Sequence, residues 1–550
     1  MRSSGLVSIA LFTALMNAQR GAEPQDAQKA AETGTLEGRV VGAIKGEPVR
    51  KATLILWRDG DPQSPRYSTA TDSHGSFAMQ DVEPGKYRLM VMKGGYARTE
   101  YGAHGPRHPG TTISLDPGQH ARDLLVRMIP QAVISGRVLD EDGEPVANVS
   151  LQLSQYVYGG GKPKLETSEF ATTNDLGEYR LFDLEPGRYY LSAYPQNDID
   201  VQEGSARGQS YAPTYYPGTA DPAGAGLLDV RPGMQLRGID IPLMKVRTVR
   251  VRGRTMLPEK GLPAQQVNVM LAPRDESRGF FSPGSPNMDA QGTFEFRGVA
   301  PGAYFLIAQS GHDGKSYCAR QAIDVRQTDI DNLVLELSPV PELKGWLRVE
   351  GRSPQTMADI RIMLEPDGNA FMGWASAPVH TDGSFTLSNV AAGQYQLHVG
   401  GLPEDYYVKT ARLGDKDLLE SGLDGARAGT GPLEVVVSSL GGQVEGVVLN
   451  AEEQPAAGAA VVLVPGPVRR TQSRFYREVT TDQYGRFNIK GVAPGDYKLF
   501  AWEDVETGAY EDPDFLTPFE PLGESLTIRA GRHENKELKL ILSEGTNAAN

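Results

Sequence analysis

The sequence predicts an all-β protein, organised as a tandem array of five β-sandwich domains. Four residues recur five times at one internal spacing: a glycine, an aromatic residue two positions later, a second glycine ten after the first, and a tyrosine twelve after the first. Short runs of alternating apolar and polar residues lie between them, separated by Gly, Pro, Asn and Asp, which is typical of strands joined by turns. Repetition at intervals of roughly a hundred residues indicates one domain type copied in series.

The five copies are complete at all four positions. They are Gly75/Phe77/Gly85/Tyr87, Gly177/Tyr179/Gly187/Tyr189, Gly292/Phe294/Gly302/Tyr304, Gly383/Phe385/Gly393/Tyr395 and Gly485/Phe487/Gly495/Tyr497. A proline precedes the second glycine in every copy except the fourth, which has Ala392. A further glycine opens each domain, at Gly38, Gly136, Gly253, Gly345 and Gly446.

Each repeated position has a mechanical explanation. The first glycine is expected to end a hairpin turn that an aspartate opens, at Asp72, Asp175, Asp289, Asp382 and Asp482. These aspartates also raise the alternative of calcium binding. Each turn offers only one carboxylate, whereas calcium takes six or more oxygen ligands, so turn capping is favoured. The tyrosine resembles a tyrosine corner, with a buried ring and a hydroxyl that reaches the backbone.

The second domain illustrates the predicted strands. We expect strands at 132–139, 146–153, 170–173, 178–182, 188–194, 227–230 and 238–244, with a variable stretch at 154–169 and a hairpin across the turn at 174–177. The predicted domains span 33–130, 131–246, 247–340, 341–440 and 441–545. Their junctions are short, which predicts a semi-rigid string of domains.

These motifs resemble the carboxypeptidase regulatory-like domain. The resemblance rests on Gly-x-Val in a first strand, a Gly-x-Pro turn, (Asn/Asp)-x-x-Gly-x-(Phe/Tyr) and Pro-Gly-x-Tyr-x-Leu, and it is strongest in the second and fifth domains. It implies an Ig-like or prealbumin-like β-sandwich related in fold to carbohydrate-binding modules, and a bacterial secreted or cell-envelope protein. It identifies a scaffold, which can carry many functions.

Charge and composition narrow the function classes. The net charge of −14 argues against a nucleic-acid partner. Cys318 is the single cysteine, so no intrachain disulfide can form, and we expect it to be a buried strand residue. Residues 1–22 are predicted to be a signal peptide, with one basic residue before an apolar stretch, which implies an exported protein. No later stretch is apolar enough to span a membrane, so the mature chain is predicted to have no membrane span.

The sequence also lacks catalytic patterns. None of its eight histidines belongs to a His-Glu-x-x-His motif, and neither Gly-x-Ser-x-Gly nor a phosphate-binding loop occurs. His104 and His108 have helical spacing, but the neighbouring Gly105, Pro106 and Pro109 exclude a helix there. We therefore predict no enzymatic activity, no metal and no cofactor.

Loop tyrosines of the second domain are the best candidates for a binding surface. Tyr156 and Tyr158 lie in the variable stretch, and Tyr211, Tyr215 and Tyr216 lie in an insertion. A tyrosine offers a flat apolar face and a polar tip, which suits sugar rings or peptide. The alternative is that these rings cover the end of their own sandwich.

The function predicted from the sequence is a non-catalytic exported binding or scaffold protein of the cell envelope, whose partner is a glycan or an envelope protein. The alternative is an accessory or regulatory subunit that acts with a separate peptidase. The sequence leaves the oligomeric state open.

Overall fold

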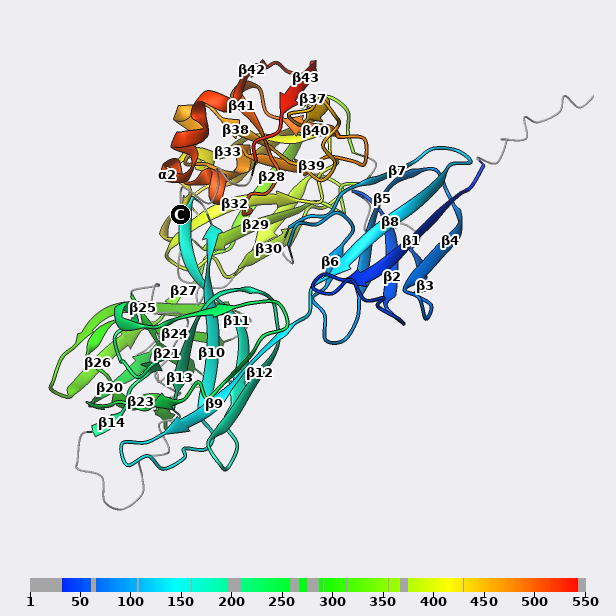
Figure 1. Ribbon diagram of the computed structural model, residues 1–550. Coiled ribbons are helices and arrows are strands. Elements are labelled where there is room, and N and C mark those ends of the chain that lie inside the picture. The colour runs from blue at the N-terminus through cyan, green and yellow to red at the C-terminus, as the bar shows by residue number, and fades with distance from the viewer. Residues whose placement is uncertain are drawn as a thin grey trace, which may run out of the picture.

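The computed structural model describes residues 32–60, 66–105, 108–159, 161–195, 209–257, 267–274, 286–289, 291–312, 315–354, 356–366, 374–428 and 430–542. Nearly all regular structure in these residues is β-strand (Figure 1). We group the strands into five modules by the sheets that they form. The predicted signal peptide lies outside the described residues, and none of the helices within them is long and apolar enough to cross a membrane.

Modules 1 and 2 contain the first nineteen strands. Module 1 consists of β1 (Gly34–Gly42), β2 (Thr53–Arg58), β3 (Tyr67–Ala70), β4 (Ser76–Val82), β5 (Gly85–Met92), β6 (Thr99–Glu100), β7 (Ile113–Leu115) and β8 (His120–Met128). Module 2 consists of β9 (Ala132–Leu139), β10 (Ser150–Gly159), β11 (Lys162–Thr172), β12 (Glu178–Leu184), β13 (Gly187–Tyr194), β14 (Gln209–Tyr211), β15 (Thr214–Tyr215), η2 (Pro222–Gly224), β16 (Leu227–Val230), β17 (Gln235–Arg237), β18 (Ile241–Pro242) and β19 (Lys245–Arg247).

Modules 3 and 4 follow. Module 3 consists of β20 (Val249–Met256), β21 (Val267–Pro273), β22 (Asn287–Met288), β23 (Thr293–Val299), β24 (Gly302–His312), β25 (Lys315–Val325), β26 (Ile330–Glu336) and β27 (Ser338–Pro339). Module 4 consists of β28 (Leu343–Glu350), β29 (Arg361–Pro366), β30 (Ala375–Pro378), β31 (Ser384–Leu387), β32 (Gln394–Gly400), β33 (Tyr407–Leu413), β34 (Lys416–Asp417), α1 (Leu418–Ser421), β35 (Leu423–Asp424), η5 (Gly425–Arg427) and β36 (Leu433–Ser438).

Module 5 ends the described chain and carries most of the helical turns. It consists of β37 (Gly442–Leu449), β38 (Ala460–Pro465), η6 (Pro467–Arg469), η7 (Ser473–Phe475), β39 (Arg477–Thr480), β40 (Arg486–Val492), β41 (Gly495–Trp502), η8 (Ala509–Glu511), α2 (Pro513–Leu516), η9 (Thr517–Leu522), β42 (Glu524–Ile528) and β43 (His533–Lys539).

All five modules share one strand arrangement. The first strand of each module lies between an antiparallel neighbour, the strand that follows the repeated first glycine, and a parallel neighbour near the module's end. In module 1 these are β4 and β8, and in module 5 they are β40 and β43. A second sheet packs against the first, with the order β3-β2-β5-β6 in module 1 and β39-β38-β41-β42 in module 5. The fold class predicted from the sequence, an all-β protein of sandwich domains, is confirmed.

The glycine that opens each module is required by the close approach of the parallel strand. A Cβ added at Gly446 would lie 1.7 Å from the carbonyl oxygen of Lys536, and one at Gly136 would lie 2.0 Å from that of Ile239. At Gly38, Gly253 and Gly345 an added Cβ would lie 2.1, 2.6 and 2.3 Å from the carbonyl oxygen of the parallel strand. No larger residue fits without displacing the neighbouring backbone.

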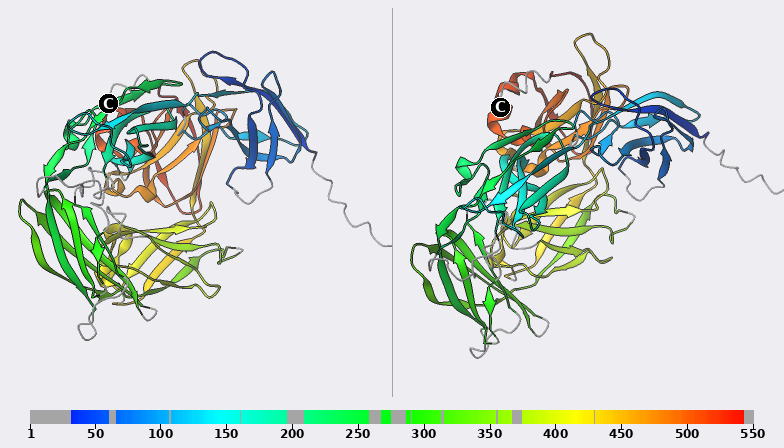
Figure 2. Two further views of the ribbon diagram at one scale, coloured as in Figure 1. Left: turned by 90° about the horizontal axis from the view of Figure 1, so that it is seen from below. Right: turned by 60° about the horizontal axis from the view of Figure 1, so that its bottom comes forward.

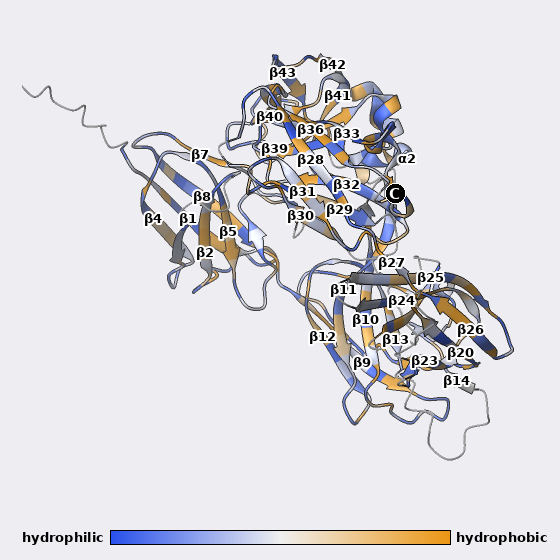
Figure 3. Cartoon of the chain, turned by 180° about the vertical axis from the view of Figure 1, so that it is seen from behind, coloured by the Kyte–Doolittle hydropathy of each residue, from blue (hydrophilic) through white to orange (hydrophobic). Residues whose placement is uncertain are grey.

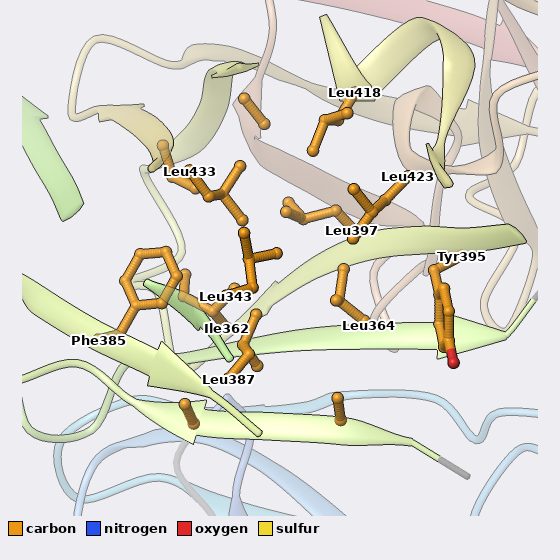
Figure 4. Packing of buried hydrophobic residues seen from close by; sticks show 14 of the residues in the cluster. Leu343, Ile362, Leu364, Phe385, Leu387, Tyr395, Leu397, Leu418, Leu423 and Leu433 are labelled. Atoms are coloured by element: carbon orange, nitrogen blue, oxygen red, sulfur yellow. The ribbon is translucent and has the colours of Figure 1, made fainter. Parts of the chain in front are cut away.

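Each module has its own hydrophobic core. The buried clusters run from Leu36 to Met128, Ala132 to Leu243, Val249 to Leu337, Leu343 to Val437, and Val444 to Leu538. The strands alternate between hydrophobic and hydrophilic residues (Figure 3), and in module 4 leucines of both sheets pack together between Phe385 and Tyr395 (Figure 4). These clusters fall within the five predicted ranges, while the exact domain count and boundaries stay a prediction.

Module 5 has a second apolar cluster outside its sandwich. Trp502 is fully buried and stacks on Phe500, with ring centroids 5.0 Å apart, beneath Phe515 of α2 and Phe519 of η9. The short helices between β41 and β42 therefore cover the outer face of the β38–β41 sheet.

Two local predictions were wrong. In modules 1, 2, 4 and 5 the turn at the first glycine does not join a hairpin, because the strands on its two sides pair in different sheets; β11 pairs with β10, whereas β12 pairs with β9. Among the described strands, those that flank this turn pair with each other only in module 3, as β22 and β23. The variable stretch at 154–169 is also regular, since it forms most of a long β10–β11 hairpin.

The prediction of a string of domains was wrong as well. The array folds back, so that module 5 lies against both module 1 and module 4, and the β10–β11 hairpin of module 2 reaches toward α2 (Figures 1 and 2). Lys490 of module 5 forms an ion pair with Glu404 of module 4 at 3.0 Å. Short junctions restrict neighbouring modules, but contacts between distant modules decide the final arrangement.

Candidate functional site

Tyr156 lies on an exposed face of module 2. Its side chain is 49% exposed, and its ring meets the ring of Tyr190 edge to face, with centroids 5.6 Å apart. Ser154 of β10 is directly opposite Tyr190 of β13, and two residues further along the strand bring Tyr156 to the same face. The edge-to-face contact restrains the Tyr156 ring, while about half of the residue stays exposed to solvent.

A third aromatic ring shares this face of the sheet. Phe170 of β11 is 64% exposed and pairs with Gln152, which lies two residues before Ser154 on β10. We call Tyr156, Tyr190 and Phe170 the aromatic face. Tyr190 and Phe170 were not predicted from the sequence, because only the pairing of β10 with both neighbours shows that they share a face with Tyr156. Alternation along β13 was an available signal, since Tyr189 is buried and its neighbour Tyr190 must point outward.

Tyr158 does not belong to the aromatic face. It lies near the tip of the β10–β11 hairpin and packs against the outer cluster of module 5. A Cβ added at Gly508 would lie 3.1 Å from the Cβ of Tyr158, so the two backbones approach closely. Burial, followed by the nearby Asp512 and Glu506, raises the pKa of the Tyr158 hydroxyl. Tyr158 is therefore a contact between modules.

Tyr211 has local partners at the other end of module 2. Its hydroxyl donates a hydrogen bond to Glu141, and the ammonium group of Lys245 lies 5.0 Å from its ring centroid. Lys245 also forms an ion pair with Glu141. The hydrogen bonds from Lys245, then Tyr211, lower the pKa of Glu141 to about 2. This group joins the insertion to the start of module 2.

Tyr215 and Tyr216 are structural residues of the insertion. Tyr215 is 5% exposed and pairs with Ser192 of β13, and Tyr216 packs against the core of module 2. The structure therefore separates the five predicted tyrosines into Tyr156 on the aromatic face, Tyr158 at the contact with module 5, and three residues at the insertion. Whether any of them binds a ligand stays a prediction.

The repeated tyrosines act as corners in four modules. The hydroxyls of Tyr87, Tyr189, Tyr304 and Tyr497 each donate to the carbonyl oxygen four residues earlier, at 2.7, 2.9, 3.0 and 2.8 Å. Tyr395 is the exception: its ring is fully buried, but its hydroxyl has no hydrogen-bond acceptor among the described residues. Tyr395 belongs to the copy that lacks the proline. Ala391, four residues earlier, occupies the position whose carbonyl oxygen accepts in the other modules, and here the backbone of Gly425 lies against that oxygen.

The turn aspartates cap their own turns. Oδ1 of Asp482 accepts the backbone N–H groups of Tyr484 and Arg486, both at 2.9 Å. In the second copy the prediction of Asp175 was wrong, since Asn174 accepts the corresponding N–H groups of Leu176 and Glu178. Within the described ranges, His, Cys, Asp and Glu side chains form no group of three able to hold a metal ion.

Cys318 and His108 lie at contacts between modules. Cys318 of β25 is half-buried and packs against the core of module 4, and burial raises the pKa of its thiol. His108 of module 1 lies with its Nε2 atom 3.2 Å from a carboxylate oxygen of Asp504 in module 5. Neither arrangement pairs a nucleophile with a base in the way that nucleophilic catalysis needs.

Residues 35–128, 133–208 and 443–513 match the carboxypeptidase regulatory-like domain. The chain carries carboxypeptidase regulatory-like domains. They correspond to modules 1, 2 and 5, so the resemblance predicted for the second and fifth domains is confirmed, and the first domain shares it. Domains of this kind are non-catalytic.

Matches to individual proteins are distant. Colossin-A of Dictyostelium discoideum is 23% identical over 353 residues, which cover 60% of this chain and 3% of Colossin-A, so the chain spans a small part of that relative. The Bacillus anthracis TIE protein has a TM-score of 0.17 and 12% identity, and covers 56% of this chain and 51% of its own. GBS52, a minor pilin of Streptococcus agalactiae, has a TM-score of 0.23 and 12% identity, and covers 39% of this chain and 98% of its own.

Proposed function

We propose that this protein is a non-catalytic, exported scaffold of the cell envelope that binds carbohydrate through the aromatic face of module 2. The observation that carries the proposal is the exposed Tyr156 ring, held edge to face by Tyr190 on a sheet of a carboxypeptidase regulatory-like domain. Sugar rings present apolar C–H faces that stack on such an aromatic side chain, while hydroxyl groups bind the polar tips.

Other repeated polar groups of the motif have structural partners, which supports a scaffold. The corner tyrosines of modules 1, 2, 3 and 5 donate to their own backbone, and the turn aspartates accept from theirs. Contacts between distant modules hold the array in one arrangement, which would present the aromatic face in a constant direction. The apolar N-terminal stretch supports export.

The test is retention of the full chain by soluble polysaccharides in affinity electrophoresis. Tyr156→Ala should weaken retention by roughly tenfold, because one stacking ring contributes on the order of 1 kcal/mol or more. Phe182→Ala is the matched control, since Phe182 is 56% exposed but lies on β12 in the other sheet.

Three results would contradict parts of the proposal. Equal retention of the Tyr156→Ala and Phe182→Ala proteins would remove the aromatic face as the binding surface. Chelator-sensitive turnover of peptides by the purified chain would show an enzyme. An intact N-terminus on protein found in the cytoplasm would exclude export. Within the described residues, no specific observation favours the alternative of a peptidase accessory subunit.

A further inference from the structure

A cavity of about 410 Å³ lies between modules 4 and 5. Module 4 contributes β32 and the 401–408 segment, including Tyr406 and Tyr407, and module 5 contributes Arg474, Phe475 and Arg477. Its volume is in the range of small-molecule sites, which are mostly apolar and contain a few convergent polar groups. Leucine and valine side chains supply much of the apolar wall, and His398, Glu404 and Lys490 also line the cavity beside the two arginines.

Arg474 is half-buried and has no ion-pair partner in the described part of the chain. Its guanidinium donates to the carbonyl oxygen of Leu419 and, at 2.5 Å, to Oε1 of Gln472, but Nε is buried and has no hydrogen-bond partner. Burial lowers the pKa of this guanidinium to about 10, although Asp417 and Glu420 act on it in the opposite direction from a distance. It remains charged at neutral pH.

Arg477 also lacks an ion-pair partner among the described residues. Its Nη1 atom donates to the carbonyl oxygens of Arg474 and Tyr476, at 2.7 and 2.9 Å. Both acceptors are neutral, and among the described residues no carboxylate lies within ion-pair distance of Arg477. Burial lowers the pKa of this guanidinium too.

The other ionisable side chains at the cavity have partners among the described residues. Lys490 forms an ion pair with Glu404 at 3.0 Å, and His398 lies 3.0 Å from Glu365. The ring of Phe475 contacts Arg474 and the neighbouring Arg469, whose guanidinium carbons lie 4.4 and 4.6 Å from its centroid. The cavity therefore has two half-buried guanidinium groups that form no ion pair with a carboxylate among the described residues.

Burying an unpaired charge is costly, and a bound anion removes that cost. A guanidinium presents its N–H groups in a planar fork that matches a carboxylate. The aromatic and aliphatic wall suits the body of an organic molecule better than a small inorganic ion. We propose that this cavity binds a small organic carboxylate, whose carboxylate group is held by Arg474 and Arg477. The site is separate from the aromatic face, and the two proposals can be confirmed or contradicted independently.

The test is isothermal titration calorimetry on the full chain, with D-glucuronate and benzoate as carboxylate probes and glucose and inorganic phosphate as comparisons. Both carboxylates should bind, more weakly at higher salt, and glucose should not bind. Arg477→Gln should weaken carboxylate binding at least about tenfold, because charge-assisted hydrogen bonds are lost. The affinity of Arg477→Lys for the carboxylates should lie between those of the wild type and Arg477→Gln. Arg532→Gln, at an exposed position of module 5, is the matched control.

Thermal unfolding provides a second, independent measurement of carboxylate binding. The carboxylate probes should raise the melting temperature of the wild-type chain and not that of Arg477→Gln. If Arg477→Gln does not fold, Arg474→Lys replaces it, since it keeps the charge but loses the planar fork. The proposal is overturned if neither carboxylate binds at millimolar concentration, if the variants bind as well as wild type, or if phosphate binds more tightly than the carboxylates.

Discussion

Ser114 and Gln483 exchange two hydrogen bonds although 369 residues separate them in the chain. The backbone N–H of Ser114 donates to Oε1 of Gln483 at 2.9 Å, and Nε2 of Gln483 donates to the carbonyl oxygen of Ser114 at 2.7 Å. Beside them, Oδ2 of Asp482 accepts from the Ser114 hydroxyl at 3.1 Å, while its Oδ1 caps the turn. A turn that stabilises module 5 is thus also its docking point on module 1.

Gln483→Ala should release module 1 from module 5. The substitution removes two hydrogen bonds, and the backbone N–H and carbonyl groups of Ser114 bind water instead. We expect the association of the two modules to weaken by about 1–3 kcal/mol. Small-angle scattering should show a larger radius of gyration, while circular dichroism stays unchanged. Gln235→Ala, at an exposed position of module 2, serves as the control. An unchanged scattering curve would mean that other contacts hold the two modules together.

The corner tyrosines should differ in their response to removal of the hydroxyl. Tyr497→Phe loses the hydrogen bond to Ala493 and should destabilise module 5 by about 1 kcal/mol. Tyr395→Phe should be neutral or stabilising, because it removes a buried hydroxyl that has no acceptor among the described residues. Urea unfolding measures both. Equal destabilisation by the two substitutions would show that Tyr395 finds a partner in solution.

The turn at Asp289 should contribute to the pH dependence of stability. Its carboxylate accepts the backbone N–H groups of Thr293 and Gln291, and the bond from Thr293 chiefly lowers its pKa below the ordinary value of 3.8. Because the pKa is lower in the folded state, the stabilisation is present above about pH 4 and is lost as the pH falls through the folded pKa.

Asp289→Asn keeps the acceptor oxygen and removes the titration, as Asn174 does in module 2. The variant should lose less stability than wild type when unfolding is measured from pH 5 down to pH 2.5. The reciprocal substitution, Asn174→Asp, should make the loss steeper. Parallel pH profiles for all three proteins would contradict the capping account.

The opening glycine of module 5 should tolerate no side chain. Gly446→Ala places a Cβ 1.7 Å from the carbonyl oxygen of Lys536, so β43 must move away, at a cost of about 2–3 kcal/mol or more. Gly431→Ala is the control, because a Cβ there meets nothing within 4 Å. Thermal unfolding of both variants measures the effect, and similar melting temperatures would show that β43 adapts without strain.

The sequence predicted the features that depend on neighbours in the chain. A cap from Asp482 to Arg486, and a corner from Tyr497 to Ala493, each span four residues, so the residues that form them appear together in the motif. Even here a choice between adjacent residues was wrong at Asp175, since both Asp and Asn side chains can cap such a turn.

The candidate site was predicted less well, because it depends on strand pairing. The tyrosines at 156 and 158 look equivalent in sequence, yet one is on an open face and the other is packed against module 5. Tyr190 joined the aromatic face only through its pairing opposite Ser154. Arg474 and Arg477 gave no signal at all, because a charged residue is ordinary in a sequence and becomes unusual only when it is buried.

The sequence by itself determined the repeating all-β architecture, the tyrosine corners and the capped turns, because a glycine, an acceptor side chain or a tyrosine acts over a few residues. Only the tertiary structure decided that the array folds back on itself, that Tyr156 stays exposed, and that two arginines meet at a cavity between modules 4 and 5. Those outcomes depend on contacts between segments tens to hundreds of residues apart, whose free energy arises only after the strands have paired and the sandwiches have packed together.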